Sequence, residues 1–146
     1  MGEHCTIVMY HYVRELEKTR FPEIKGRRTS EFKEQLEYLD KHYEFIRIED
    51  LRRAIDGETT IPDNSVLLTF DDGYSDHYTD VFPLLDEMGI QGCFYAPVRA
   101  IQEGEVLDVN KIHFLLANTP LEPLLEDVIQ RLKSAQDEYD IPSPDY

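Results

Sequence analysis

Residues 65–74 read SVLLTFDDGY, and this stretch decides the fold class. Its first six residues form a largely apolar run, which is typical of a strand buried on both faces of a parallel sheet. The acidic pair Asp71 and Asp72 follows at the carboxyl end of that strand, where parallel α/β folds gather their functional side chains. Gly73 permits a sharp turn, so both carboxylates can face one pocket.

Three further strands are predicted around this stretch, at residues 5–12, 44–48 and 91–96. Apolar residues at helical spacing predict helices between and after the strands. The expected helices cover residues 30–42, 49–56, 76–88, 109–117 and 122–139. Strands that alternate with helices indicate β/α units with right-handed crossovers. The sequence therefore predicts an α/β fold with about four parallel strands and a helical C-terminal segment, which is either a small open sheet or part of a (β/α) barrel.

Local signals predict several of the helix ends. Thr29 or Ser30 is expected to cap the helix at 30–42, and Asp108 the helix at 109–117. Pro83 lies inside the helix at 76–88, so that helix either begins near Phe82 or bends there. The tail at residues 141–146, IPSPDY, is expected to be extended.

The composition excludes several classes of partner. The chain has 146 residues and a net charge of -15, which argues against nucleic-acid binding and against an anionic membrane surface. It has no apolar run long enough to span a membrane and no signal-peptide pattern, so we expect a cytoplasmic protein. Cys5 and Cys93 are expected to be buried free thiols. Residues 13–28 are locally basic and form either a solvated loop or a rim that contacts an anionic or sugar-bearing substrate.

Several segments together resemble the polysaccharide deacetylases, the NodB-homology group also called carbohydrate esterase family 4. They are VLLTFDDGY, the opening IVMYHYV, the helix VFPLLDEMGI and the strand GCFYAP. The segment LDVNKIHFLLAN resembles a branch of the family found among surface-polysaccharide genes, and the resemblance covers most of residues 5–117. It implies a deformed (β/α) barrel of the NodB-homology type. It also implies metal-dependent hydrolysis of N-acetyl groups on an amino sugar or a surface polysaccharide.

The resemblance assigns roles to individual residues. Asp71 would be the catalytic general base, and Asp72 would be a ligand of a divalent metal, with zinc as the first choice. His11 ends the first predicted strand and is a candidate substrate-binding residue, although a core or capping role is as plausible. Tyr74 is a second such candidate, because its ring could contact the face of a sugar or could simply pack.

The chain departs from the family pattern after residue 117. The family draws two further metal ligands from a pair of histidines four residues apart, and no two of the five histidines here have that spacing. Catalytic zinc usually has three protein ligands, so we expect an incomplete metal site. We interpret residues 1–118 as the N-terminal part of a deacetylase domain and 119–146 as an acidic helical segment and tail of a truncated chain. Exposed sheet edges would then favour self-association, or completion by a missing C-terminal half.

Two other function classes remain to be separated from the enzyme. One is a non-catalytic fragment that binds a saccharide or a protein partner. The other is a phospho-acceptor domain with clustered carboxylates, which is disfavoured because the acidic pair follows the third strand and neither Lys111 nor Lys133 lies at a strand end. Of the remaining histidines, His77 is expected on the surface or at a helix start and His113 in packing or at an interface.

Overall fold

The computed structural model describes residues 4–139 and contains one sheet of four parallel strands. The strands are β1 (Cys5–Tyr10), β2 (Glu44–Phe45), β3 (Ser65–Asp71) and β4 (Gly92–Tyr95). All ladders run through β3, which pairs with β1 from Cys5↔Ser65 to Tyr10↔Phe70. Since β1 fills one edge of β3, the other edge is shared by β2 at its start and β4 at its end. The parallel α/β architecture predicted from the sequence is confirmed.

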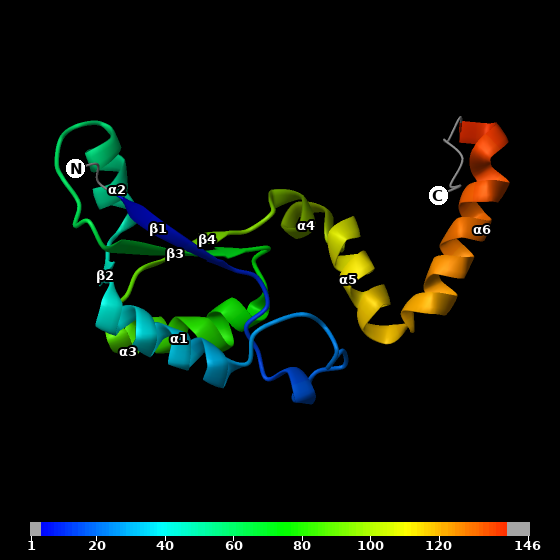
Figure 1. Cartoon of the computed structure of the whole chain (residues 1–146), viewed down its shortest axis with the longest axis horizontal. Coiled ribbons are helices and arrows are strands. Elements are labelled where there is room, and N and C mark those ends of the chain that lie inside the picture. Colours follow the sequence, from blue (N-terminus) through cyan, green and yellow to red (C-terminus); the bar gives the residue numbers. More distant parts are fainter. Residues whose placement is uncertain (1–3, 140–146) are drawn as a thin grey trace.

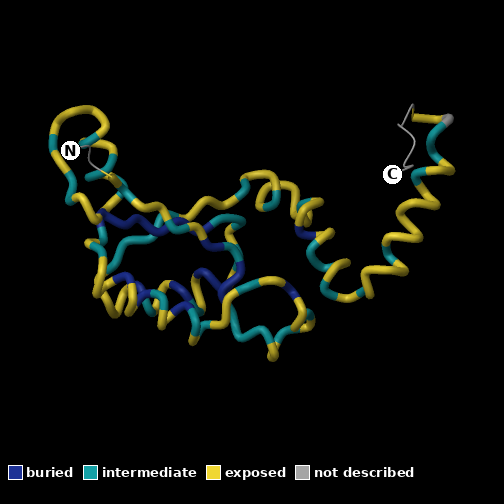
Figure 2. The backbone as a smooth tube through the Cα atoms, viewed as in Figure 1, coloured by how far each residue is buried: buried dark blue, intermediate teal, exposed yellow. Residues whose placement is uncertain are grey.

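Helices cover one face of this sheet. The helices α1 (Thr29–His42) and α3 (Phe82–Met88) lie together along that face, as Figure 1 shows. Tyr10 and Phe70 belong to the core, and Phe70 stacks on Tyr10 and on the partly exposed Phe94 at centroid distances of 5.5 and 4.9 Å. Phe32 of α1 packs edge-on against Phe70 at 5.9 Å. The buried residues therefore gather between the strands and these helices, as in Figure 2.

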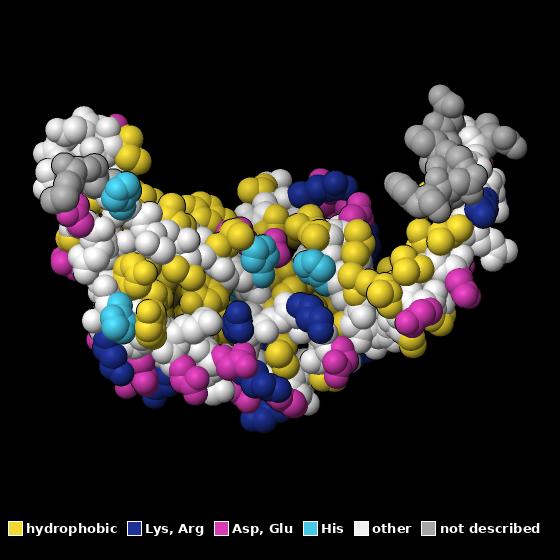
Figure 3. Space-filling view, viewed as in Figure 1, with side chains coloured by type: hydrophobic (Ala, Val, Ile, Leu, Met, Phe, Trp, Pro, Cys, Tyr) yellow, Lys and Arg dark blue, Asp and Glu magenta, His cyan; other side chains and the backbone are white. Residues whose placement is uncertain are grey.

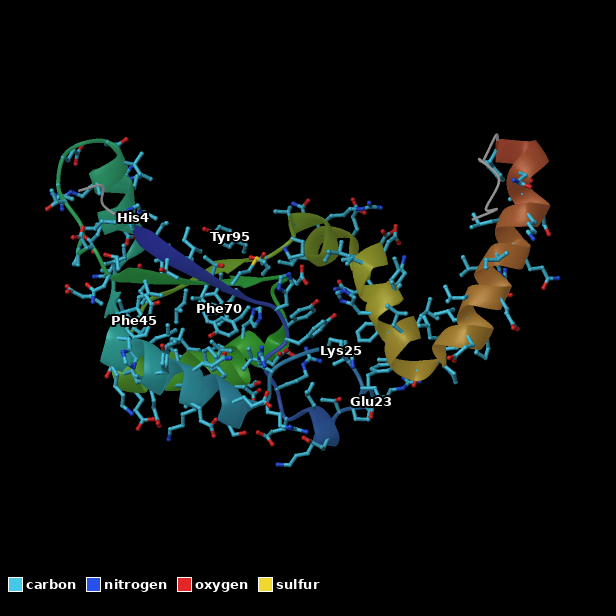
Figure 4. The ribbon with its side chains drawn as sticks, viewed as in Figure 1. His4, Glu23, Lys25, Phe45, Phe70 and Tyr95 are labelled. Atoms are coloured by element: carbon cyan, nitrogen blue, oxygen red, sulfur yellow. The ribbon has the colours of Figure 1, made fainter. Side chains whose placement is uncertain are left out.

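The opposite face of the sheet is open. Side chains alternate along a strand, so Ile7 and Met9 point away from the core, and they are 57% and 59% exposed. Tyr95 on β4 is 55% exposed on the same face. Figure 4 places Phe70 on the helix-covered side and Tyr95 on the other side. Asp71 pairs with Tyr95 in the ladder, so the first carboxylate of the motif belongs to the open face.

The remaining helices are α2 (Ile48–Ile55), α4 (Val98–Glu103), α5 (Asp108–Asn118) and α6 (Leu121–Tyr139), and a short 3-10 turn covers Leu16–Lys18. In Figure 1, α5 and α6 lead away from the sheet as an arm. The expected helices at 109–117 and 122–139 match α5 and α6 closely. The extended tail expected at 141–146 lies outside the described residues. No helix within residues 4–139 is both long and apolar enough to cross a membrane.

Several local expectations are wrong. The strand expected at 44–48 is only two residues long, because Ile48 already begins α2. The helix α1 is capped from Arg28, whose backbone N–H donates to Glu31 at 3.1 Å, and not from Thr29 or Ser30. Asp108 lies in the first turn of α5 and pairs with Lys111 at 2.8 Å, so it is not the cap. The two cysteines are half-buried, not buried.

The segment that follows the DDGY motif contains a π-helical turn, which the sequence does not reveal. This turn covers His77–Val81 and runs directly into α3. The Phe82 N–H reaches back five residues to the His77 carbonyl. Pro83, the next residue, has no N–H and cannot donate the backbone hydrogen bond of an α-helix. The wider π-helical turn accommodates this missing hydrogen bond, and α3 begins at Phe82.

Candidate active site

The two acids of the motif sit in a tight turn at the carboxyl end of β3. Asp71 is the last residue of the strand, and Asp72 has a φ of 74°. Gly73 follows with a φ of 61°. The left-handed region is sparsely populated by residues other than glycine, although aspartate tolerates it better than most. Strained backbone of this kind is found preferentially at functional sites.

Gly73 is required by space as well as by conformation. A Cβ atom at this position would lie 2.8 Å from the Cβ and 3.1 Å from the Cα of Ala96. Ala96 directly follows β4, so the turn of the motif packs against the end of the neighbouring strand. The close packing against Ala96 therefore restricts the orientation of the acidic turn relative to the sheet.

The Asp72 carboxylate is held by the tyrosine two residues further on. The Tyr74 hydroxyl donates to Asp72 Oδ2 at 2.6 Å, and Asn110 Nδ2 of α5 donates to the same hydroxyl oxygen at 2.6 Å. Burial, and then the hydrogen bond to Asp72, raises the pKa of the Tyr74 hydroxyl well above its ordinary value of 10. The phenol therefore stays protonated and keeps its donor for the carboxylate.

The Tyr74 ring is itself packed. It stacks on Tyr12 with centroids 4.3 Å apart. The Arg14 guanidinium lies over both rings, 4.8 Å from the Tyr12 centroid and 5.4 Å from that of Tyr74. Protein therefore covers one face of the Tyr74 ring, so the ring has a packing role. Its assignment as a substrate-binding residue stays a prediction.

A buried ion pair ties this turn to the end of β1. Asp76 is 5% exposed and accepts hydrogen bonds from Arg14 Nη2 at 2.7 Å and from the Val13 N–H at 3.1 Å. A buried carboxylate needs such partners, since an unpaired charge in the interior is costly. The basic segment 13–28 is thus partly structural, because its first arginine anchors the acidic turn.

His77 is buried at 4% exposure, so the expectation of a surface position is wrong, although it does begin the π-helical turn. Its Nε2 lies 2.6 Å from the carbonyl oxygen of His11. A carbonyl only accepts, so Nε2 carries a hydrogen and donates it. Nδ1 is buried and has no hydrogen-bond partner within the part of the chain that the structure describes.

His11 lines an open groove of about 1080 Å³ along β1 and α1. Lys25, Arg27 and His113 also line this groove, whereas Asp71 and Asp72 do not. His113 reaches from α5, where its Nδ1 lies 3.3 Å from the Tyr12 hydroxyl. The structure thus places His11 one strand away from the acidic pair. Its assignment as a substrate-binding residue remains a prediction.

The described residues do not complete a metal centre. Within residues 4–139, no group of three histidine, cysteine, aspartate or glutamate side chains is placed to hold a metal ion. A catalytic zinc site needs about three protein ligands. Asp72 can offer one carboxylate, so the residues described here do not by themselves fit a catalytic metal.

Sequence reasoning missed three members of the site, which are Asn110, Asp76 and Arg14. Each is far from the motif in sequence or carries a side chain that usually lies on the surface. The available signals were an asparagine inside the segment LDVNKIHFLLAN and an aspartate four residues after Asp72. Neither signal says which partner the side chain meets.

A parallel β/α sheet whose central strand ends at two adjacent carboxylates defines a protein of the α/β class. The comparisons then identify the family. The polysaccharide deacetylase family matches residues 58–136, which is more than half of the chain, and the chain belongs to this family.

Individual relatives agree with this assignment. The chain is 44% identical over 59 residues to the poly-beta-1,6-N-acetyl-D-glucosamine N-deacetylase of Escherichia coli K12, covering 40% of this chain and 9% of that protein. A solved de-N-acetylase from Aggregatibacter actinomycetemcomitans superposes with a TM-score of 0.57 at 27% identity, over 70% of this chain and 40% of that one. IcaB from Ammonifex degensii gives a TM-score of 0.56 at 28% identity, over 65% and 39%. The chain therefore spans well under half the length of each of these relatives.

Proposed function

We propose that this chain carries the general base of a polysaccharide N-deacetylase, and that the substrate is a polymer of N-acetylglucosamine. The observation that carries the proposal is the acidic pair at the carboxyl end of β3, with Asp71 on the open face of the sheet. The substrate class is supported by the relative from Escherichia coli, whose name gives β-1,6-linked N-acetylglucosamine as its polymer.

The chemistry assigned to Asp71 is proton transfer. Its carboxylate accepts a proton from the water that attacks the acetamide carbonyl carbon. Transfer of that proton to the amide nitrogen then lets the C–N bond of the tetrahedral intermediate break, which releases the sugar amine and acetate. The half-buried position at a strand end suits this role, because water and substrate can both reach the carboxylate.

Asp72 is the proposed ligand of a divalent metal, with zinc as the first choice. Its Oδ2 is bound by Tyr74, and ligating carboxylates commonly carry such an outer hydrogen bond. The remaining ligands would come from residues other than 4–139.

A cytoplasmic location remains an expectation from the sequence.

An assay of acetate release tests the proposed base. The Asp71→Asn variant keeps the size of the side chain but cannot accept the proton, so activity on β-1,6-linked N-acetylglucosamine oligomers should fall by about 10²–10⁴-fold. The matched control is Asp63→Asn in the exposed turn before β3, which should leave the rate unchanged. Acetate release that survives Asp71→Asn at the full rate contradicts the proposal.

The second candidate function is a non-catalytic fragment that binds a saccharide or a protein. The observation that favours it is the lack, within residues 4–139, of three side chains placed around a metal. Calorimetric titration separates the candidates. Oligosaccharide binding without acetate release, together with no measurable zinc binding, favours the fragment. Zinc binding that is lost in Asp72→Asn, together with acetate release, favours the enzyme.

A further inference from the structure

A short chain of hydrogen bonds connects the Asp72 carboxylate to helix α5. Tyr74 donates its single hydroxyl hydrogen to Asp72 Oδ2, and the Tyr74 hydroxyl oxygen accepts a hydrogen bond from Asn110 Nδ2, with both distances at 2.6 Å. Asn110 is 7% exposed, and its Nδ2 also donates to the Tyr12 hydroxyl at 3.3 Å. Each NH₂ hydrogen of this amide therefore has its own acceptor.

The direction of this chain is fixed by the chemistry of its members. A carboxylate only accepts, so the Tyr74 hydrogen must point at Asp72. The Tyr74 hydroxyl oxygen then uses a lone pair to accept a hydrogen bond from Asn110 Nδ2, which acts only as a donor. A phenol that accepts one hydrogen bond while it donates another to a charged oxygen makes a strong and well-directed contact.

Asp72 needs such a contact if its carboxylate is to keep one orientation. Its side chain is only half-buried, and its backbone lies in the left-handed region at a φ of 74°. The Tyr74 ring can act as a rigid support, because it is stacked on Tyr12 at 4.3 Å and covered by Arg14.

We propose that Tyr74 and Asn110 are positioning residues that hold the Asp72 carboxylate in one rotamer, so that helix α5 is part of the support of the active site. This inference rests on the proposed function, in which the Asp72 carboxylate serves the reacting centre. It gives α5 a role that neither the strand motif nor the fold alone assigns to it.

Three substitutions separate positioning from simple packing. Tyr74→Phe removes the hydroxyl and keeps the stacked ring. Asn110→Asp keeps the shape but places an acceptor beside Tyr74, and that acceptor competes with Asp72 for the one phenolic hydrogen. Tyr12→Phe is the matched control, because it removes another hydroxyl bonded to Asn110 that does not touch Asp72.

The first measurement is the side-chain rotamer of Asp72 from its Hα–Hβ couplings in the isotope-labelled full chain. One large and one small coupling are expected in the parent and in Tyr12→Phe, and two equal intermediate couplings in Tyr74→Phe and Asn110→Asp. A single rotamer that persists in Tyr74→Phe overturns the proposal, as does equal averaging in Tyr12→Phe. If Asn110→Asp does not fold, the comparison of Tyr74→Phe with Tyr12→Phe decides alone.

The second measurement is acetate release by the same samples. We expect kcat to fall about tenfold or more in Tyr74→Phe, as for the loss of a group that orients a functional side chain, while Tyr78→Phe on the exposed surface stays at the parent rate. The two proposals fail separately. If the couplings respond as expected but the parent releases no acetate, the proposed function fails and the positioning role stands. If acetate is released and the couplings do not respond, the positioning role fails.

Discussion

At the scale of single residues, the acidic turn depends on two consecutive left-handed positions. Asp72 and Gly73 have φ values of 74° and 61°. The first is tolerated because aspartate can adopt this region, whereas the second also demands the absence of a Cβ atom. The turn that carries the chemistry is therefore maintained at a local cost, which the surrounding contacts offset.

Substitution of Gly73 measures that cost. Gly73→Ala adds a strained φ and a clash with Ala96, so we expect a loss of about 2–4 kcal/mol in the free energy of unfolding. Gly89→Ala is the matched control, because Gly89 has a φ of 66° but no atom within 4 Å of the new Cβ. It should lose only about 1 kcal/mol, from the strain alone. Urea unfolding of both variants checks the difference, and equal losses would mean that Ala96 does not restrict the turn.

The thiols report on the open face of the sheet. Cys93 points to this face, because it pairs with Thr69 two residues before Asp71. Burial, and next the charge of Glu49, raises the pKa of the Cys93 thiol, and burial raises that of Cys5. A raised thiol pKa means less thiolate at a given pH, so alkylation at pH 8 should be slower than for free cysteine and should accelerate as the pH rises. Rates equal to those of free cysteine at every pH would contradict the shift.

At the scale of elements, the ion pair of Asp76 joins the end of β1 to the segment after the acidic turn. Asp76→Ala removes the partner of a largely buried Arg14 and the acceptor of the Val13 N–H. We expect a loss of about 2–4 kcal/mol in unfolding free energy, since the arginine charge is left without its partner. Glu58→Ala breaks an ion pair with Arg53 whose side chains are 51% and 61% exposed, and it should change stability little. A small effect of Asp76→Ala in thermal unfolding would mean that water replaces the carboxylate.

Sequence patterns predicted the long elements well and the short ones poorly. The apolar run at 65–70 and the amphipathic residues of 30–42 have enough length for their period to be clear, and β3 and α1 confirm both. The segment at 98–103 was not predicted as a helix, because α4 has six residues and no buried face. The π-helical turn has no periodic signature of its own. In the site, the acidic pair could be read from adjacent residues, whereas the contacts of Asn110 depend on the packing of α5.

At the scale of the whole molecule, the chain leaves much apolar surface uncovered. The stripe Leu121, Leu125, Val128 and Ile129 lies along α6, with exposures of 55%, 49%, 42% and 42%. Figure 3 shows hydrophobic side chains along the visible side of this arm and near the sheet. Contiguous apolar surface of this kind usually marks an interaction site. The expectation of self-association, or of completion by further β/α units, follows from it and stays a prediction.

Light scattering during size exclusion tests the association. The average mass should rise with concentration, and it should rise further with salt, because salt screens the repulsion between chains of net charge -15. Leu125→Lys places a charge in the stripe and should shift the chain toward monomer. Gln130→Lys adds the same charge outside the stripe and should not. A mass that stays monomeric at every concentration contradicts the prediction.

The central place of β3 has a consequence for how the molecule opens. This strand is the only one in the described sheet with neighbours on both edges, and its residues from Ser65 to Phe70 are all buried. Its amides should exchange with heavy water more slowly than those of any other segment, and release of α5 and α6 should leave them protected. The acidic pair thus follows the most protected strand of the described sheet, so α6 and the outer strands can fluctuate without moving the point at which its chemistry begins, whereas α5 has to stay in place to support Asp72.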